Sequence, residues 1–255
     1  MLGTLAQFKR LAEKLDGQVY GLGPVADEIR ATLGIEGHGR DAGDYPWADG
    51  TAVMGILNVT PDSFHDGGEY EAVEDALDRA EAMVEAGADI VDVGGESTRP
   101  GADPVPAETE IERVVPVVER IADLDALVSV DTRKADVARA ALDAGADVLN
   151  DVSGLEDPEM RLVAAEYDVP VVVMHSIDAP VVPDREVEYD DVVGDVLEEL
   201  TERVLLAEKA GLDRDQIIVD PGVGFGKTGA EAFEILDRLG EFHALGCPVL
   251  FGHSH

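Results

Sequence analysis

Residues 54–64 read MGILNVTPDSF, and this stretch decides the fold class. Its first four residues are all apolar, as in a parallel strand that is buried on both faces, and the polar residues begin at Asn58. Pro61 then turns the chain. The stretch therefore predicts a buried parallel strand with polar side chains at its carboxyl end.

The same alternation is repeated along the rest of the chain. Apolar runs alternate with amphipathic helical stretches, and the sequence AGAD occurs at 86–89 and at 144–147, where a helix gives way to a strand. A weaker copy, AGLD, occupies 210–213. The glycine of each copy suits the left-handed residue that ends a helix. These repeated βα units predict an α/β fold of the (β/α)8 TIM-barrel type.

The predicted elements follow in order from residue 51. Strands are expected at 52–57, 88–94, 126–131, 146–150, 169–174, 216–220 and 247–252, and helices at 71–86, 107–122, 134–144, 157–167, 189–210 and 229–244. About seven parallel strands are thus recognisable and the eighth is missing. We expect an incomplete barrel over 51–255, preceded by an N-terminal helical segment and linker over 1–50.

Composition excludes several classes of protein. The chain of 255 residues is 45% apolar, but no apolar run approaches the ~20 residues that cross a bilayer, so we expect a cytoplasmic protein with no membrane partner. The 19 basic residues face 55 acidic ones, a net charge of −36, which leaves no basic surface for nucleic acid. The excess acidic residues repel each other, and molar salt screens this repulsion within about 3 Å. The composition therefore indicates a halophilic protein.

Polar residues end every predicted strand. They are Asn58, Asp92 with Glu96, Asp131, Asn150 with Asp151, His175, Asp220 and His253. A single Asp or Asn at a strand end often caps the next helix, and Asp151 and Asp157 have that interpretation. The carboxyl ends of barrel strands converge on one rim, however, so the whole set favours an active site.

Three long loops follow these strand ends. The loop at 58–68 has paired glycines and predicts a mobile flap that carries Asp66. In the loop at 94–104, Thr98 and Arg99 can hydrogen-bond an anion and Pro100 stiffens the turn.

The third loop, at 220–229, contains Gly-Lys-Thr after a strand and so looks like a nucleotide-binding P-loop. That motif requires glycine at 221, where this chain has Pro221, so we reject the nucleotide-binding interpretation. The more useful features are Asp220 at the strand end and Phe225, which can form an apolar wall.

Five stretches carry a family resemblance: MGILNVTPDSF, GGESTRPGA, SVDT, NDVSG and DPGVGFGKT. In this order, over about residues 45–255, the chain resembles dihydropteroate synthase. The resemblance implies an enzyme of folate synthesis that joins 4-aminobenzoate to 6-hydroxymethyl-7,8-dihydropterin diphosphate, uses Mg²⁺ and releases pyrophosphate. Homodimers are usual among the proteins that the chain resembles.

The resemblance also implies roles for individual residues. Asn58 is the metal and diphosphate contact, whereas Asp131, Asn150 and Asp220 hold the pterin. A pterin edge presents an amino group and ring N–H groups in a row, which suits carboxylate and amide acceptors. The expected substrate-binding set is Thr98, Asp131, Asn150, Asp220, Met174, Phe225, Asp92 and Pro100. Met174 is equally well interpreted as a core residue.

The implied mechanism is loss of pyrophosphate from the pterin methylene, followed by attack of the arylamine on the resulting cation. Arg99, together with Mg²⁺ and Asn58, would offset charge on the leaving group. The flaps that carry Asp66, Thr98 and Arg99, which we take as catalytic, would close and exclude water.

The chain departs from the family pattern at its end. The family continues after the seventh strand with Ser-Arg-Lys and later with an eighth strand that ends in Arg-x-His, whereas this chain reads LFGHSH at 250–255. We therefore expect the lysine and arginine contacts to be missing. Two alternatives stay open: a pterin-dependent methyl transferase that passes the methyl group to a corrinoid, and a non-catalytic pterin-binding remnant.

Overall fold

The structure of the chain is a computed structural model that describes residues 45–48, 50–60, 69–97, 104–176 and 189–252. The predicted N-terminal segment over 1–50 lies almost entirely outside these residues. Everything below refers to the described part of the chain.

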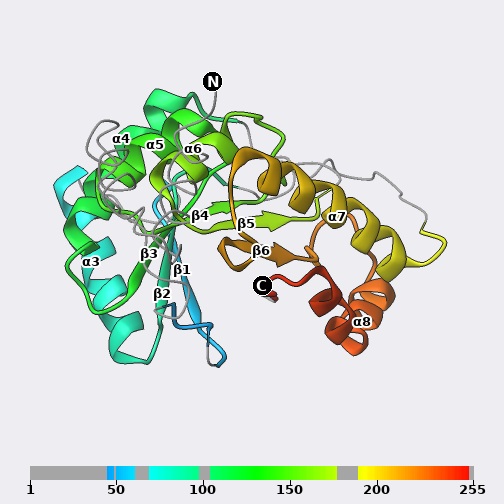
Figure 1. Cartoon of the computed structure of the whole chain (residues 1–255). Coiled ribbons are helices and arrows are strands. Elements are labelled where there is room, and N and C mark those ends of the chain that lie inside the picture. The colour runs from blue at the N-terminus through cyan, green and yellow to red at the C-terminus, as the bar shows by residue number, and fades with distance from the viewer. Residues whose placement is uncertain (1–44, 49, 61–68, 98–103, 177–188, 253–255) are drawn as a thin grey trace, which may run out of the picture.

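Six parallel strands form one sheet in the order in which they occur along the chain, and the helices cover its outer side (Figure 1). The strands are β1 (Met54–Asn58), β2 (Ile90–Gly94), β3 (Leu127–Asp131), β4 (Val148–Asp151), β5 (Val171–Met174) and β6 (Ile217–Asp220). The helices are α3 (Glu69–Glu85), α4 (Ala107–Ile121), α5 (Ala135–Asp143), α6 (Met160–Tyr167), α7 (Val192–Ala210) and α8 (Gly229–Asp237). This order of strands and crossover helices confirms the α/β class and the barrel-type topology.

Two apolar clusters hold the sheet. The larger one lies between the strands and the outer helices, where branched residues such as Val93 and Val130 are fully buried. The smaller one fills the inner side of the sheet at the amino ends of the strands, where Tyr45 packs against Ile90, Leu127, Val148, Val172 and Ile218. Trp47 stacks on Tyr45 with 4.7 Å between ring centroids.

The AGAD repeats have a clear structural reason. Gly87 and Gly145 end their helices with φ of +98° and +111°, so the predicted left-handed conformation is confirmed. The aspartate of each repeat then accepts a hydrogen bond from the backbone of the preceding strand segment. Asp89 Oδ2 accepts from Val53 N at 2.8 Å, and Asp147 Oδ2 accepts from Val128 N at 2.9 Å. The motif therefore ends a helix and joins neighbouring strands within four residues.

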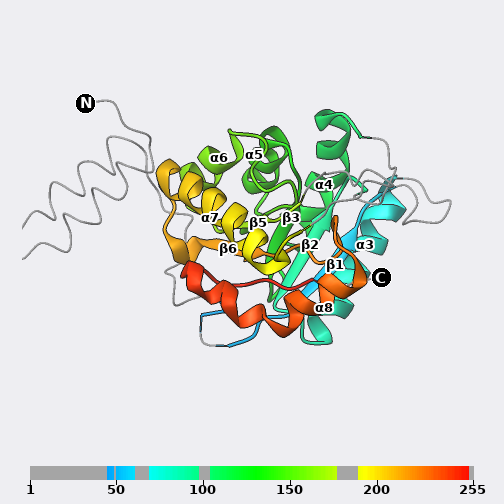
Figure 2. The same ribbon diagram turned by 90° about the vertical axis from the view of Figure 1, so that its right-hand side faces the viewer.

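The seventh strand is shorter than predicted. Within 247–252 the structure has a single parallel bridge, between Val219 and Val249, in place of a strand. Val219 N donates to Pro248 O and Leu250 N donates to Val219 O, so the segment runs beside β6 (Figure 2). Pro248 has no N–H to give to a ladder, which helps to explain why the pairing stays short.

The predicted helix at 229–244 is also interrupted. It consists of α8 and a 3₁₀ helix, η4 (Leu239–Leu245), with a break at Arg238. Gly240 weakens any continuous helix at this point. The start of α8 is well defined, because Thr228 and Glu231 form a reciprocal capping box.

Candidate active site

The register of the sheet brings the predicted strand-end residues into one row. Asn58 pairs with Gly94, Gly94 with Asp131, and Asp131 with Asn150, across four neighbouring strands. Met174 at the end of β5 pairs with Asp220 at the end of β6. Because all strands are parallel, these residues share the carboxyl-end rim, with the exception of Asp92, which lies two residues further inside β2.

Strand alternation turns these side chains toward the inner side of the sheet. Asn150 Nδ2 donates to Asp92 Oδ2 at 2.9 Å, which leaves Asn150 Oδ1 available as an acceptor. The Ser129 hydroxyl faces the same carboxylate, although the two do not reach ordinary hydrogen-bond geometry. Asp92 Oδ1 is buried and has no hydrogen-bond partner among the described residues. A ligand with N–H donors would satisfy these two oxygens.

Gly94 makes room between two further oxygens. A Cβ placed on this glycine would lie 3.5 Å from both Asn58 Oδ1 and Asp131 Oδ2. The two oxygens therefore face the same small space at the rim, where Asn58 is exposed and Asp131 is partly exposed.

Asp220 is held in one orientation by the turn that follows β6. Its Oδ1 accepts a hydrogen bond from Gly222 N at 2.7 Å, and Gly222 has a φ of +62°, a conformation that suits glycine. The carboxylate is buried, and its other oxygen, Oδ2, would lie 4.0 Å from a Cβ on Gly252. One oxygen thus remains for a ligand.

Burial makes this row electrostatically unusual. It raises the pKa of Asp92, and it raises the pKa of Asp131 well above its ordinary value, with the nearby charges of Asp92 and Glu110 adding to the effect. Burial also raises the pKa of Asp220 to about 6, against the opposing effects of the Gly222 N–H and of Lys227. Three carboxylates with raised pKa values favour a ligand that supplies hydrogen-bond donors or positive charge.

The residues at the rim fit a magnesium ion that carries a diphosphate. Mg²⁺ prefers oxygen ligands and usually takes only one or two from the protein, the others coming from phosphates and water. Asn58 Oδ1 is such a ligand, and Asp131 Oδ2 opens on the same space. Within the described residues no three His, Cys, Asp or Glu side chains gather as a metal cluster.

The remaining predicted residues divide into two groups. Asp66, Thr98, Arg99 and Pro100 lie outside the described residues. Phe225 is partly buried in the turn between β6 and α8, and Met174 is buried with its Cγ 3.1 Å from the position of a Cβ on Gly222. Met174 pairs with Asp220 in the register of the sheet, and its close approach to Gly222 supports the alternative interpretation as a core residue.

The sequence placed His175 and Glu96 at strand ends but did not reveal their partners. Lys227 bonds to His175, and Lys134 bonds to Glu96 and to Glu110. Glu110 is completely buried on the apolar face of α4. The detectable signal was a charged residue at a helical position where the pattern of valines requires an apolar one.

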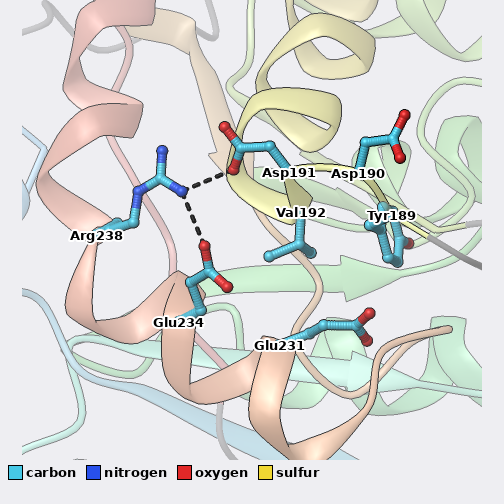
Figure 3. A pocket seen from close by; sticks show the side chains of 7 residues that line it. All are labelled: Tyr189, Asp190, Asp191, Val192, Glu231, Glu234 and Arg238. Carbon is cyan, nitrogen blue, oxygen red and sulfur yellow. Dashed lines mark hydrogen bonds and ion pairs between the residues drawn. The ribbon is translucent and has the colours of Figure 1, made fainter.

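A shallow hollow of about 260 Å³ lies elsewhere, between the first turns of α7 and α8 (Figure 3). Four carboxylates line it, those of Asp190, Asp191, Glu231 and Glu234, and Arg238 bonds to two of them. Their negative charge would repel an anionic ligand.

Comparison with known proteins agrees with the site. Residues 54–255 match the family described as pterin binding enzyme. The chain is 66% identical to a probable bifunctional folylpolyglutamate synthase/dihydropteroate synthase of Haloferax volcanii, over all of this chain and 32% of that protein. The chain thus spans about a third of the length of the first curated relatives that it matches.

Solved structures give the same result. A Xanthomonas albilineans dihydropteroate synthase with 4-aminobenzoic acid is 48% identical with a TM-score of 0.73, over 80% of this chain and 72% of that one. An Anaplasma phagocytophilum dihydropteroate synthase with bound 6-hydroxymethylpterin-monophosphate is 39% identical with a TM-score of 0.73, over 79% and 78% of the two chains. The chain therefore belongs to the pterin-binding enzyme family and is homologous to its dihydropteroate synthases.

Proposed function

We propose that this chain catalyses the dihydropteroate synthase reaction, the condensation of 6-hydroxymethyl-7,8-dihydropterin diphosphate with 4-aminobenzoate. The observation that carries the proposal is the row of buried acceptors at the rim: Asp92 Oδ1 without a partner, Asn150 with its oxygen available, and Asp220 with one oxygen available. The pterin-binding family and the ligands of the two solved relatives support the same substrates. The comparisons give no support to the methyl transferase alternative.

The acceptors bind and orient the pterin. Its amino and ring N–H groups would donate to Asp220 and Asn150, and Asp131 would supply a further acceptor beside Gly94. Met174 pairs with Asp220, and Phe225 lies in the turn that follows β6; both would contact the flat ring. Burial raises the pKa values of Asp131 and Asp220, and the N–H donors of the pterin would offset that effect.

The chemistry at the rim is largely electrostatic. A bound Mg²⁺ would neutralise charge that builds up on the departing pyrophosphate. Asn58 would orient the diphosphate, and the nearby carboxylates would tolerate the transient positive charge on the pterin. We further propose, from the family resemblance, that Asp66, Thr98, Arg99 and Pro100 close over the amine and exclude water.

The setting of the enzyme is part of the proposal. The net charge of −36, together with 66% identity to a Haloferax volcanii protein, supports a halophilic enzyme. We also propose a cytoplasmic location and a homodimer. Among the described residues no helix has both the length and the apolar character needed to span a membrane.

The test is formation of dihydropteroate from the two substrates with Mg²⁺, in molar KCl and in dilute buffer. We expect product in molar KCl that disappears when Mg²⁺ is chelated. Pterin binding without product would contradict the catalytic proposal and favour the non-catalytic remnant, and absence of pterin binding by the folded chain would contradict both.

A further inference from the structure

A lysine ammonium group is enclosed by the turn that follows β6. Lys227 Nζ donates to the carbonyl oxygens of Gly222 and Phe225, at 2.8 and 3.0 Å, and approaches Nδ1 of His175 at 2.9 Å. These three acceptors occupy the three N–H groups of the ammonium. Lys227 therefore ties both sides of the turn to the end of β5.

The carbonyl oxygens of Gly222 and Phe225 and Nδ1 of His175 form a cage around the ammonium group. His175 can be part of this cage because its ring is neutral. It is buried, and burial first and the charge of Lys227 second lower its pKa to about 4. A neutral ring that accepts at Nδ1 carries its proton on Nε2, and Nε2 lies 3.4 Å from Glu199 Oε2 on α7. The imidazole is thus oriented as an acceptor for Lys227 throughout the neutral pH range.

Gly222 links the cage to the candidate active site. Its carbonyl oxygen accepts from Lys227, while its N–H donates to Asp220 Oδ1 at 2.7 Å. The turn lies so close to β5 that a Cβ on Gly222 would be 2.1 Å from the carbonyl oxygen of His175. A shift of this one residue would rotate the Asp220 carboxylate.

We propose that Lys227 is a positioning residue: it holds the 221–226 turn against β5 so that Gly222 fixes the orientation of Asp220. Its donors are used within the protein, so it acts through Gly222 and not by contact with substrate. The consequence for pterin binding rests on the proposed function, whereas the effect on the turn does not.

The charge of Lys227 adds a second effect. The ammonium lowers the pKa of Asp220 and so favours the ionised carboxylate at neutral pH. The other charged groups around the cage are Glu199 and Glu231, which raise the pKa of Lys227, and Arg203, which lowers that of His175. Burial outweighs the carboxylates and lowers the pKa of Lys227 to about 8, so the ammonium is present at pH 7.

The first test needs no ligand. Amide hydrogen exchange would be compared by NMR in wild type, Lys227→Met and Lys209→Met, where Lys209 is exposed on the last turn of α7 and gives the matched control. Phe225 N donates to Gly222 O and Gly222 N donates to Asp220, so both amides are hydrogen-bonded in the wild type. We expect exchange at both to become at least tenfold faster in Lys227→Met only, in folded protein. Unchanged exchange would overturn the proposal.

The second test measures pterin affinity by pterin fluorescence between pH 6 and 8.5. We expect Lys227→Met to bind about tenfold more weakly at pH 7 and to need a higher pH for half-maximal binding, while the KM for 4-aminobenzoate changes little. Lys227→Gln keeps an amide donor, so its pterin affinity should lie between those of wild type and Lys227→Met. It also replaces Lys227→Met in this test if the methionine variant folds poorly. Equal affinity and an equal pH midpoint in all variants would overturn the proposal. A wild type without pterin affinity would contradict the proposed function, and the exchange comparison would still decide the role of Lys227.

Discussion

At the scale of single residues, the Asp220 carboxylate offers the clearest test of the site. Replacing it with asparagine keeps the shape but removes the charge that a pterin N–H would meet. We expect Asp220→Asn to weaken pterin binding by about 1–3 kcal/mol, roughly fivefold to 150-fold, the usual loss for a charge-assisted hydrogen bond. Calorimetric titration with the pterin would measure this, and Asp123→Asn, at an exposed position after α4, is the control. Unchanged affinity would remove Asp220 from the site.

The same residue predicts a pH dependence. Because the pKa of Asp220 is raised to about 6, the carboxylate is ionised above that pH and protonated below it. Pterin affinity should therefore fall as the pH drops through 6, and the Asp220→Asn variant should lose this step. A fluorescence titration from pH 4.5 to 8 would show it. An identical pH profile in both proteins would assign the step to another group.

At this scale the sequence could predict which polar residues form the row at the rim, because each of them follows an apolar run. Asn58, Asp131, Asn150 and Asp220 stand where the pattern placed them. It could not predict the cage around Lys227, because that depends on a backbone carbonyl of Gly222 and on the neutral state of His175. The position of this carbonyl group and the neutral state of His175 arise only when the chain folds and buries them.

At the scale of elements, a buried ion pair connects α4 to the loop after β3. Glu110 on α4 is fully buried, and its Oε2 accepts from Lys134, whose side chain is 23% exposed. Lys134 also contacts Glu96, but Glu96 has Arg133 as a further partner at 2.9 Å. Loss of Lys134 would therefore leave Glu110 as the group without a counterion.

This pair gives a stability prediction. Lys134→Met should cost about 3–5 kcal/mol in the free energy of unfolding, because it leaves a buried charge unpaired. The double variant Lys134→Met with Glu110→Met should recover most of that loss. Urea unfolding in molar KCl would measure both. Arg120→Met, which breaks an exposed pair between Arg120 on α4 and Glu74 on α3, should cost less than about 1 kcal/mol. Equal losses for Lys134→Met and Arg120→Met would contradict the argument.

Element prediction succeeded where local chemistry and long-range packing agree. The AGAD repeats are examples, because glycine ends the helix and aspartate accepts a hydrogen bond from the preceding strand segment. It failed at 229–244, where Arg238, at the break, forms an ion pair with the distant Asp191 that no local pattern reveals. It also overestimated the strand at 247–252, whose pairing with β6 is limited to one bridge.

At the scale of the whole molecule, the dominant feature is the excess of 55 acidic over 19 basic residues. The carboxylates are spread over helix surfaces, and on α3 the exposed set is Glu74, Asp75, Asp78, Glu81 and Glu85. Repulsion among such charges reaches about 10 Å at 0.1 M salt and only about 3 Å at 1 M. Most neighbouring carboxylates on a helix therefore repel each other in dilute buffer and are screened from each other in concentrated salt.

We therefore expect the chain to unfold progressively as KCl is lowered from molar concentration to about 0.1 M, because self-repulsion then opposes the compact state. Circular dichroism and the thermal midpoint would follow this loss. Sucrose favours burial without screening charge, so it should not replace KCl. A variant with Asp75→Asn, Asp78→Asn, Glu81→Gln and Glu85→Gln removes four exposed charges and should stay folded at a lower KCl concentration than wild type. An equal KCl requirement in the two proteins, or full rescue by sucrose, would show that repulsion between surface carboxylates does not set the salt dependence.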